Sequence, residues 1–377
     1  MKIVQLCPYA MDRPGGVQRH VRDLSAWLES EGHRTRIIAP PSPGGQTGAD
    51  GKITSIGHAR KLALHGTEFE VSWASRAALR ALARELKLWG AELVHMHTPW
   101  TPFLTAQMFR ALALPAVTTV HATLPESGLN SIADRFIRRS ARRLLPQSRA
   151  VVIPSGAPLP MLRRLLPGLE PQILPPAIDL SPWVTAGRSP VRRKGLSLVF
   201  LGRLEPRKGV DVLLDAWPRI AAALPDAHLT IAGDGPLRPQ VDAARSDRLH
   251  LVRRPDDAAA QVLLAAADFC LAPAPYGESF GLVLTEAMAA GSLPVAAANP
   301  GFASVLTGPG AELLVPPGDA GALARKIITL AAAPETCDSL HRWSRHEAAR
   351  LDIAHQGPRF LRLYESVLAD HPPASSC

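Results

Sequence analysis

The sequence predicts two successive α/β domains, each a mostly parallel sheet with helices on both faces. The chain has 377 residues, which is more than one hydrophobic core comfortably holds, so two domains are expected. Short apolar runs alternate with longer helical stretches along the chain, as is typical of βαβ units. Apolar residues make up 46% and charged residues 20%, a balance that excludes a disordered, collagen-like or membrane-embedded chain.

The first domain is expected to begin with a strand at 3–6, followed by a turn that contains Gly15-Gly16. An amphipathic segment predicts a helix at 17–31, and a loop rich in Pro and Gly covers 40–51. The same alternation then predicts a helix at 75–88 and strands at 36–39, 93–97, 117–121 and 151–154.

The second domain follows a polar, basic segment at 187–195, and the boundary is expected near Pro175-Pro176. Its pattern predicts helices at 210–223, 259–266 and 281–290, and strands at 198–201, 228–232, 249–253, 269–272 and 293–296. A last helix is expected at about 357–369. The chain is therefore divided into residues 1–178, 179–352 and 353–377, the last of which could pack back on the first domain.

Cysteine usage and hydropathy favour a cytosolic protein. The four cysteines, Cys7, Cys270, Cys337 and Cys377, are widely scattered without C-x-x-C spacing, so reduced thiols are expected rather than disulfides or a zinc site. The apolar run at the start is too short for a signal peptide, and the most apolar stretch, 280–306, is broken by charged and proline residues.

The net charge of +9 favours anionic partners, although a solvated basic surface explains it equally well. Nucleic acid, an anionic membrane and a phosphorylated ligand are all compatible with such a charge. No nucleic-acid recognition motif accompanies it, so a nucleic-acid partner is not expected.

Candidate site residues follow the predicted strands, because ligands of doubly wound sheets bind outside the carboxyl ends of the strands. Gly15 and Gly16 precede the first helix and would let an anion approach its N-terminus, although a plain turn explains them too. His121 ends a predicted strand, where it is a candidate substrate contact or a hydrogen-bonded structural histidine.

The second domain has two candidate segments. Arg203 and Lys208 follow its first strand and could hold a diphosphate, while Arg207 is expected to be solvated. Glu278 and Glu286, in an E-x7-E spacing, flank the start of a predicted helix whose first amides could receive an anion. Two carboxylates beside an anion site suit a nucleotide sugar; a helix cap with a structural glutamate is the alternative.

These segments together resemble the retaining glycosyltransferases of family 4, and the resemblance covers nearly the whole chain. Its most specific parts are Glu278–Glu286 and Gly202-Arg203 with Lys208-Gly209, and Gly233–Pro236 matches a turn common in the family. The opening Cys7-Pro8-Tyr9 with Pro14–Gln18 and His20-Val21 is similar to the phosphatidylinositol mannosyltransferases of actinobacteria. The resemblance implies the GT-B fold, in which two Rossmann-like domains face each other across a cleft.

The resemblance also implies roles for individual residues. The implied catalytic residues are His121, Arg203, Lys208 and Glu278. The implied donor-binding residues are Gly15, Gly16, Arg203, Lys208, Glu278, Ser279, Phe280, Gly281, Leu282 and Glu286. Weaker implications are acceptor contacts by Tyr9, Gln18 and His121. No Asp-x-Asp metal motif is found, and neither a metal nor a tightly bound cofactor is expected.

Three segments depart from the family's pattern. Pro175–Asp179 replaces a Pro-Asn-Gly turn at the domain junction, and Val252–Pro255 replaces a glycine-bearing edge near the donor base. Ala122–Pro125 replaces a hydroxyl-rich run after His121. The resemblance therefore predicts the reaction class more firmly than it predicts the hinge geometry, the base of the donor or the acceptor.

Two basic amphipathic segments are candidates for an anionic membrane surface, or are ordinary surface helices. Their basic residues are Arg76, Arg80, Arg84 and Lys87 in one and Arg138, Arg139, Arg142 and Arg143 in the other, with Arg135 preceding them. The function predicted from these features is transfer of a hexose from a UDP- or GDP-sugar to a lipid or lipid-linked glycan, at the inner face of a bacterial cell membrane. A soluble acceptor, or a non-catalytic scaffold that binds nucleotide sugar or lipid, is the alternative, and the oligomeric state stays open.

Overall fold

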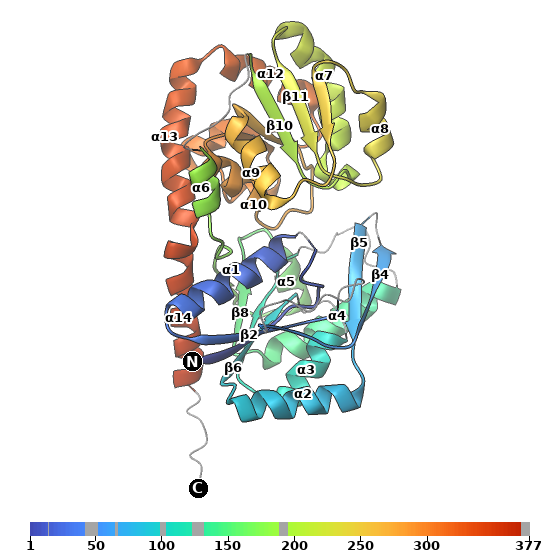
Figure 1. Ribbon diagram of the computed structural model, residues 1–377, viewed down its shortest axis with the longest axis vertical. Helices are drawn as coiled ribbons and strands as arrows, with labels where there is room; N and C mark the ends of the chain where they lie inside the picture. Colours follow the sequence, from blue (N-terminus) through green and yellow to red (C-terminus); the bar gives the residue numbers. More distant parts are fainter. Residues whose placement is uncertain are drawn as a thin grey trace. The chain divides into compact units, whose positions relative to one another are not determined.

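A computed structural model describes residues 1–13, 15–41, 52–64, 67–98, 103–122, 132–187 and 195–370, of which 61–64, 67–70, 132–134 and 136–137 are described by their backbone alone. Most of the loop at 40–51, most of the basic segment at 187–195, residues 123–125 and Cys377 lie outside these ranges. The chain divides into an N-terminal unit, Met1–Ile178 with Ile353–Cys377, and a C-terminal unit, Asp179–Asp352. Figure 1 shows both.

The N-terminal unit is built on a seven-stranded parallel sheet in the order β3-β2-β1-β6-β7-β8-β9. Its strands are β1 (Lys2–Leu6), β2 (Arg34–Ala39), β3 (Ile53–Ser55), β6 (Leu93–His97), β7 (Ala116–Thr119), β8 (Ala150–Ile153) and β9 (Gln172–Ile173). The strand order reverses between β1 and β6, so the carboxyl ends of these neighbouring strands form a topological switch point, where doubly wound folds bind ligands. The strand predicted at 117–121 ends at Thr119, which leaves His121 in the following loop.

Helices cover both faces of this sheet. They are α1 (Gly16–Ser30), α2 (Arg76–Trp89), α3 (Leu104–Leu112), α4 (Ile132–Leu144), α5 (Leu159–Leu165) and α14 (Ile353–Ala369). One core cluster joins α2 and α3 to the sheet, and another joins α1 and α14 to it. An antiparallel hairpin of β4 (His58–Leu64) and β5 (Thr67–Trp73) lies in a segment for which the sequence predicts no strand.

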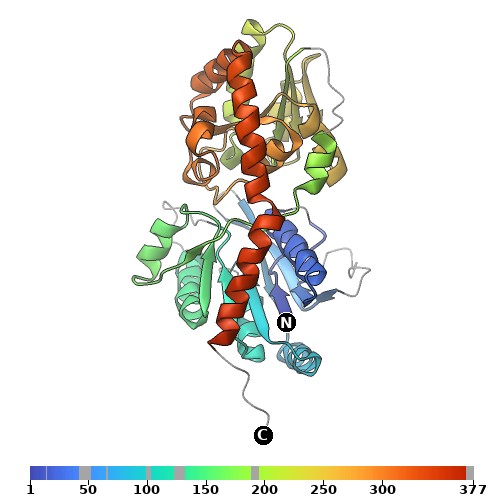
Figure 2. The ribbon, with the colours of Figure 1, turned by 90° about the vertical axis from the view of Figure 1, so that its left-hand side faces the viewer.

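The C-terminal helix α14 belongs to the N-terminal unit, as Figures 1 and 2 show by its position beside α1. Phe360 and Tyr364 are buried against the sheet, and a Cβ on Gly357 would lie 2.5 Å from the Trp27 ring. Glycine therefore permits the close approach of α14 to α1. The helix begins at Ile353 rather than near 357, because the chain joins this unit there: the Ile353 amide donates to the Ile178 carbonyl.

The C-terminal unit has a six-stranded parallel sheet in the order β12-β11-β10-β13-β14-β15. Its strands are β10 (Ser197–Leu201), β11 (His228–Ala232), β12 (Leu249–Val252), β13 (Phe269–Ala272), β14 (Leu293–Ala297) and β15 (Leu314–Val315). The order reverses between β10 and β13, which is the Rossmann arrangement predicted. The strand predicted to reach Arg253 ends at Val252, since Arg254 turns the chain with φ +44°.

The helices of this unit are α6 (Ser181–Gly187), α7 (Val210–Ala223), α8 (Arg238–Ala243), α9 (Asp257–Ala266), α10 (Leu282–Ala290), α11 (Pro300–Ala303), α12 (Ala320–Ala331) and α13 (Pro334–Leu351). Helix α9 starts two residues before the predicted 259 because the Asp256 carboxylate accepts the Ala259 amide and caps it. Among the described residues, none of the helices combines the length and the apolar character that crossing a membrane requires.

Candidate active site

In the C-terminal unit, the loops after β10 and β11 lie directly against each other. The Gly202 amide donates to the Ala232 carbonyl at 3.0 Å, and the Leu204 amide donates to the Asp234 carbonyl at 3.0 Å. A Cβ on Gly233, whose φ is +156°, would lie 1.8 Å from the Gly202 carbonyl oxygen, so no other residue fits there. These contacts fix the start of the loop that carries Arg203 and Lys208.

Lys208 and Glu278 meet at the carboxyl edge of this sheet. The Lys208 Nζ lies 2.7 Å from Glu278 Oε1, and the Arg207 Nη1 lies 3.2 Å from the same oxygen. Arg207 is therefore not the solvated charge that the sequence predicts, because it turns toward Glu278 and lies 3.8 Å from the buried Glu205. Arg203, half exposed, pairs with the other oxygen of Glu205 at 2.6 Å.

The ionised form of Glu278 is strongly favoured by its neighbours. Burial alone would raise the pKa of this carboxyl group, but the charges of Lys208 and Arg207 and the Lys208 hydrogen bond together hold the pKa below its ordinary value. Glu278 is therefore ionised, and the two cations that pair with it, Arg207 and Lys208, lie on the loop after β10. A diphosphate brought to this edge would meet the same cations.

Helix α10 begins immediately after Glu278. Gly281 is its N-cap with φ +117°, and a Cβ there would lie 2.5 Å from the Phe302 ring. The preceding Ser279 and Phe280 are buried, and the Leu284 amide donates to the carbonyl of the N-cap Gly281 at 3.0 Å. The amides that come before it at a helix start have no acceptor within the helix. The start of α10 is where the sequence predicts an anion site, and that prediction is taken up in the proposed function.

Glu286 lies about one turn into α10 and is half-buried. Burial, together with the charge of the nearby Glu286, raises the pKa of the Cys270 thiol in β13. The Glu286 carboxylate therefore lies near Cys270, close to the start of β13, on the same helix whose N-terminus follows Glu278. The loops at this sheet edge thus hold three cations, Arg203, Arg207 and Lys208, and the carboxylates of Glu205 and Glu278, beside the start of α10.

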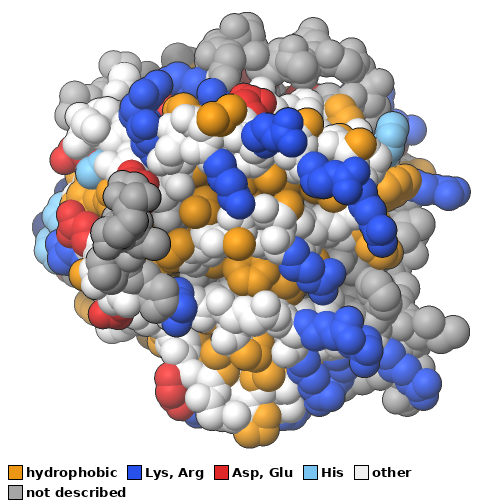
Figure 3. All heavy atoms as spheres, turned by 90° about the horizontal axis from the view of Figure 1, so that it is seen from below, with side chains coloured by type: hydrophobic (Ala, Val, Ile, Leu, Met, Phe, Trp, Pro, Cys, Tyr) orange, Lys and Arg blue, Asp and Glu red, His pale blue; other side chains and the backbone are white. Residues whose placement is uncertain are grey.

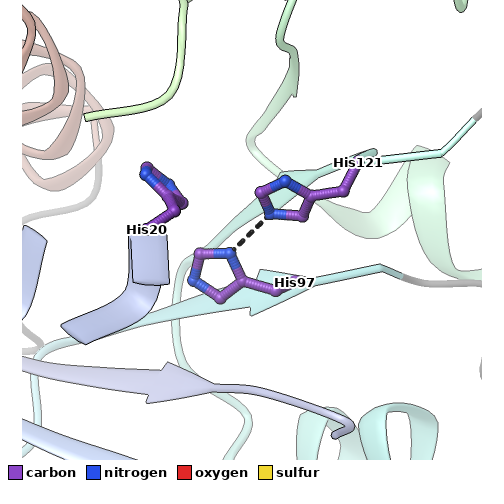
Figure 4. Close-up of side chains that lie close together, drawn as sticks. All are labelled: His20, His97 and His121. Carbon is purple, nitrogen blue, oxygen red and sulfur yellow. Dashed lines mark hydrogen bonds between the residues drawn. The ribbon is translucent and has the colours of Figure 1, made fainter. Parts of the chain in front are cut away.

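The N-terminal unit gathers four histidines at its own switch point. His95 and His97 lie on β6, His121 follows β7, and His20 lies near the start of α1. The His97 Nδ1 and His121 Nε2 atoms are 2.9 Å apart, and the His20 ring centre lies 5.4 Å from the centres of both His97 and His121 (Figure 4). The sequence analysis marks only His121 as a site residue. The other three histidines lie close to the ends of a predicted strand or helix, and that placement is the signal by which they could have been found.

These imidazoles are held in the neutral form. Burial lowers the pKa of His20 to about 4, and burial with mutual repulsion keeps the pKa values of His95, His97 and His121 well below the ordinary value. Neutral imidazoles can hydrogen-bond sugar hydroxyls or offer nitrogen lone pairs.

The remaining predicted residues of this unit lie in the β1–α1 segment. Gly15 is the extended N-cap of α1 and Gly16 its first residue, and both are exposed. Gln18 is buried, and its Nε2 donates to the Ala10 carbonyl at 3.4 Å; Tyr9 is half-buried. Gln18 therefore packs beneath the turn, since a Cβ on Gly15 would lie 2.5 Å from its Oε1.

The basic face of α2 is exposed, and its apolar face is not. Arg76, Arg80, Arg84 and Lys87 are exposed, and Figure 3 shows Lys and Arg side chains gathered over the face of the molecule where α2 lies. The leucines on the other face of this amphipathic helix, Leu79, Leu82 and Leu86, belong to the core.

Helix α4 is tied more closely to its unit. The Arg142 Nε donates to the Leu165 carbonyl at 3.2 Å, and Arg138 is half-buried, while Arg139 and Arg143 are exposed. Two apolar residues of this helix, Phe136 and Ile137, are described by their backbone alone. Arg135 and Arg142 are exposed as well, so α4 also presents basic groups to solvent.

Comparisons with known proteins identify the family. Residues 14–182 match the family described as Glycosyltransferase Family 4, and residues 195–333 match Glycosyl transferases group 1. The phosphatidyl-myo-inositol mannosyltransferase of Mycolicibacterium smegmatis is 31% identical over 97% of this chain and 94% of its own length. Its counterpart in Mycobacterium leprae is 30% identical over 97% of both chains.

Solved structures agree on the fold. Sucrose-phosphate synthase from Thermosynechococcus elongatus aligns with a TM-score of 0.76 at 21% identity, over 98% of this chain and 99% of its own. Anabaena HepE in complex with UDP and glucose aligns with a TM-score of 0.76 at 18% identity, over 97% of this chain and 100% of its own. The predicted resemblance is confirmed: the chain belongs to glycosyltransferase family 4, has the GT-B fold and is a glycosyltransferase.

Proposed function

We propose that the protein is a retaining glycosyltransferase that moves a hexose from a nucleoside-diphosphate sugar to a lipid or lipid-linked glycan. The observation that carries the donor half is the contact of Lys208 with Glu278 beside the N-terminus of α10. The acceptor half is supported by relatives named phosphatidyl-myo-inositol mannosyltransferase, which match almost the whole chain.

The C-terminal unit is the proposed donor domain. Arg203 and Lys208 would neutralise the diphosphate, and the amides at the start of α10 would add donors to it. Glu278 would bind sugar hydroxyls once the diphosphate draws Lys208 away, and Glu286 would accept from the ribose. The complexes of HepE with UDP and UDP-glucose support a uridine or similar donor for the fold, with UDP or GDP as the candidates here.

The proposed chemistry is a same-face displacement that keeps the anomeric configuration. The leaving diphosphate gains negative charge as the sugar becomes oxocarbenium-like, so Lys208 and Arg203 stabilise the transition state more than the ground state. In the N-terminal unit, the proposed acceptor side, Gly16 would offer an amide to the diphosphate, and the neutral His121 would contact the sugar near its reacting carbon. Tyr9 and Gln18 are proposed acceptor contacts, although the burial of Gln18 favours a role in shaping the turn.

The proposed location is the inner face of the cell membrane, with α2 as the attachment surface. Four basic side chains of α2 are exposed together with Leu88, whose exposed fraction is 84%. Its core-facing leucines are already packed, so attraction to anionic lipid would be mainly electrostatic.

A panel of nucleotides tests the donor proposal. Thermal unfolding of the full chain would be followed with UDP, GDP, ADP and their hexose conjugates. A ligand at 100 times its dissociation constant stabilises by about 2.7 kcal/mol, so one base should raise Tm selectively. If no nucleotide shifts Tm of the folded chain, the donor site is refuted; if nucleotides bind but no sugar is ever transferred, a scaffold is favoured.

Vesicle sedimentation tests the membrane proposal. Binding to phosphatidylcholine vesicles that contain phosphatidylglycerol should exceed binding to pure phosphatidylcholine and weaken with salt. At about 1 kcal/mol for each basic residue, Arg80→Gln with Arg84→Gln should weaken binding about thirty-fold. The matched control removes two exposed charges of the C-terminal unit, Arg219→Gln with Arg325→Gln. Equal losses in both pairs would contradict attachment by α2, and no binding to either vesicle would favour a soluble acceptor.

A further inference from the structure

Three histidine side chains of the N-terminal unit lie close enough together to hold one metal ion. His20, His97 and His121 each offer one ring nitrogen, and these three nitrogens lie within 4.8 Å of one another. The three come from α1, the end of β6 and the loop after β7, so they are brought together by the sheet and not by sequence spacing (Figure 4).

In His20 and His97, one ring nitrogen donates a hydrogen bond to an oxygen atom. The second nitrogen of each ring therefore carries the lone pair that a metal ion needs. The His20 Nδ1 lies 3.1 Å from the Ala177 carbonyl oxygen, which can only accept, so this ring carries its proton on Nδ1 and leaves a lone pair on Nε2. The His97 Nε2 lies 2.8 Å from Gln5 Oε1, which likewise leaves a lone pair on Nδ1. Metal-binding histidines show this pattern, with the second nitrogen donating to a carbonyl or amide oxygen.

The His20 Nε2 is a buried polar atom without a hydrogen-bond partner among the described residues. The residue is 1% exposed, so water does not satisfy this nitrogen from bulk solvent. A buried nitrogen left in that state costs stability, and a ligand that accepts its lone pair would remove the cost. With Nδ1 occupied by the Ala177 carbonyl, Nε2 is the His20 nitrogen that can join His97 and His121.

The neighbouring His95 does not belong to the set. Its Nδ1 lies 2.7 Å from the Tyr364 hydroxyl and its Nε2 lies 2.7 Å from the Thr119 hydroxyl, so both nitrogens are already hydrogen-bonded. His121, in contrast, is half-buried, so this member of the set is partly accessible to solvent.

We propose that His20, His97 and His121 bind a divalent transition-metal ion of the Zn²⁺ class through Nε2, Nδ1 and Nε2, with water as the fourth ligand. Three imidazoles and an open position are a coordination that Zn²⁺ accepts. Tetrahedral Zn²⁺ with bonds of about 2.0–2.1 Å holds its nitrogens about 3.4 Å apart. In the metal-free chain the His121 Nε2–H donates to the His97 Nδ1 at 2.9 Å. These two rings must therefore move apart slightly, and the His121 proton must pass from Nε2 to Nδ1 when the metal binds.

The site does not depend on the proposed transferase role, but it bears on it. A metal ion would occupy the His121 nitrogen that otherwise faces His97, so that ring could no longer contact a sugar. Metal binding is therefore expected to inhibit transfer and not to support it. All three rings are neutral at neutral pH, as ligation requires.

Titration of the untagged, chelator-treated full chain with Zn²⁺ and Co²⁺ tests the proposal. One ion per chain should bind, and Co²⁺ should give the intense visible bands of a tetrahedral site without a sulfur charge-transfer band. His20→Asn and His97→Gln should each weaken binding at least about 100-fold, since each removes a ligand. His95→Gln, in the same cluster, and His250→Gln, in the C-terminal unit, are matched controls and should leave the affinity unchanged.

X-ray absorption of the Zn²⁺-loaded wild-type chain keeps the proposal falsifiable if a variant fails to fold. Three imidazole ligands would support it. Absence of binding by the folded chain, a cysteine ligand, or unchanged affinity in folded His20→Asn would overturn it. None of these readouts involves sugar transfer, so their failure is distinct from failure of the proposed function.

Discussion

Replacing Lys208 with alanine tests the proposed donor site most directly, because Arg207 supplies a matched control. Both cations approach Glu278 Oε1, at 2.7 and 3.2 Å, and their side chains are 25% and 26% exposed. Coulomb attraction varies inversely with distance, so the attraction of Arg207 is about 0.84 (2.7/3.2) of that of Lys208. Each alanine variant should therefore lose a similar free energy of unfolding, about 1–2 kcal/mol, between the values for exposed and buried ion pairs.

The two alanine variants should differ in catalytic activity, although they lose similar stability. Lys208 is proposed to neutralise the leaving diphosphate, so Lys208→Ala should lower kcat/KM about 10²–10³-fold. Arg207→Ala should lower it less than about ten-fold, because Arg207 is not among the residues proposed to neutralise the leaving diphosphate. Urea unfolding measures the free energy of unfolding of each variant. The value of kcat/KM is measured from the release of nucleoside diphosphate, with the donor that the thermal-shift panel identifies. Equal losses of kcat/KM in the two variants, or full activity in Lys208→Ala, would refute the reasoning.

Two further predictions concern the segment before α10. The lowered pKa of Glu278 means that its ion pairs stabilise the fold fully above its ordinary value of 4.5 and are lost as pH falls through the lowered value. The urea midpoint of Glu278→Gln should thus depend less on pH between about 3 and 6 than that of the wild type; equal slopes would contradict this. Gly281→Ala combines left-handed backbone strain of about 1–3 kcal/mol with overlap on Phe302, whereas Gly291→Ala has the strain and nothing within 4 Å. Thermal unfolding should show a larger loss for Gly281→Ala, and equal losses would show that the overlap adds nothing.

Several side chains show where prediction from sequence stopped. Arg207 and Lys208 are neighbours of the same charge, and nothing local tells that both turn to a carboxylate about seventy residues away. The leucines of α2 have the spacing of a membrane-facing stripe, yet the same spacing serves a core-facing one, and the sheet takes them. His20 and His97 look individually like ordinary structural histidines.

The sequence by itself determined the alternation of strands and helices, the two-domain division and the family, because hydrophobic periodicity and glycine turns are local properties of the chain. Helix 210–223 was placed without error, and the strand and helix ends that differ do so by a few residues, where caps and turns decide. Only the tertiary structure decided which distant side chains meet. Parallel register sets His97 opposite Thr119, two residues before His121, and the return of α1 along the sheet brings His20 to both; such pairings depend on the packing of whole elements and leave no trace in local sequence.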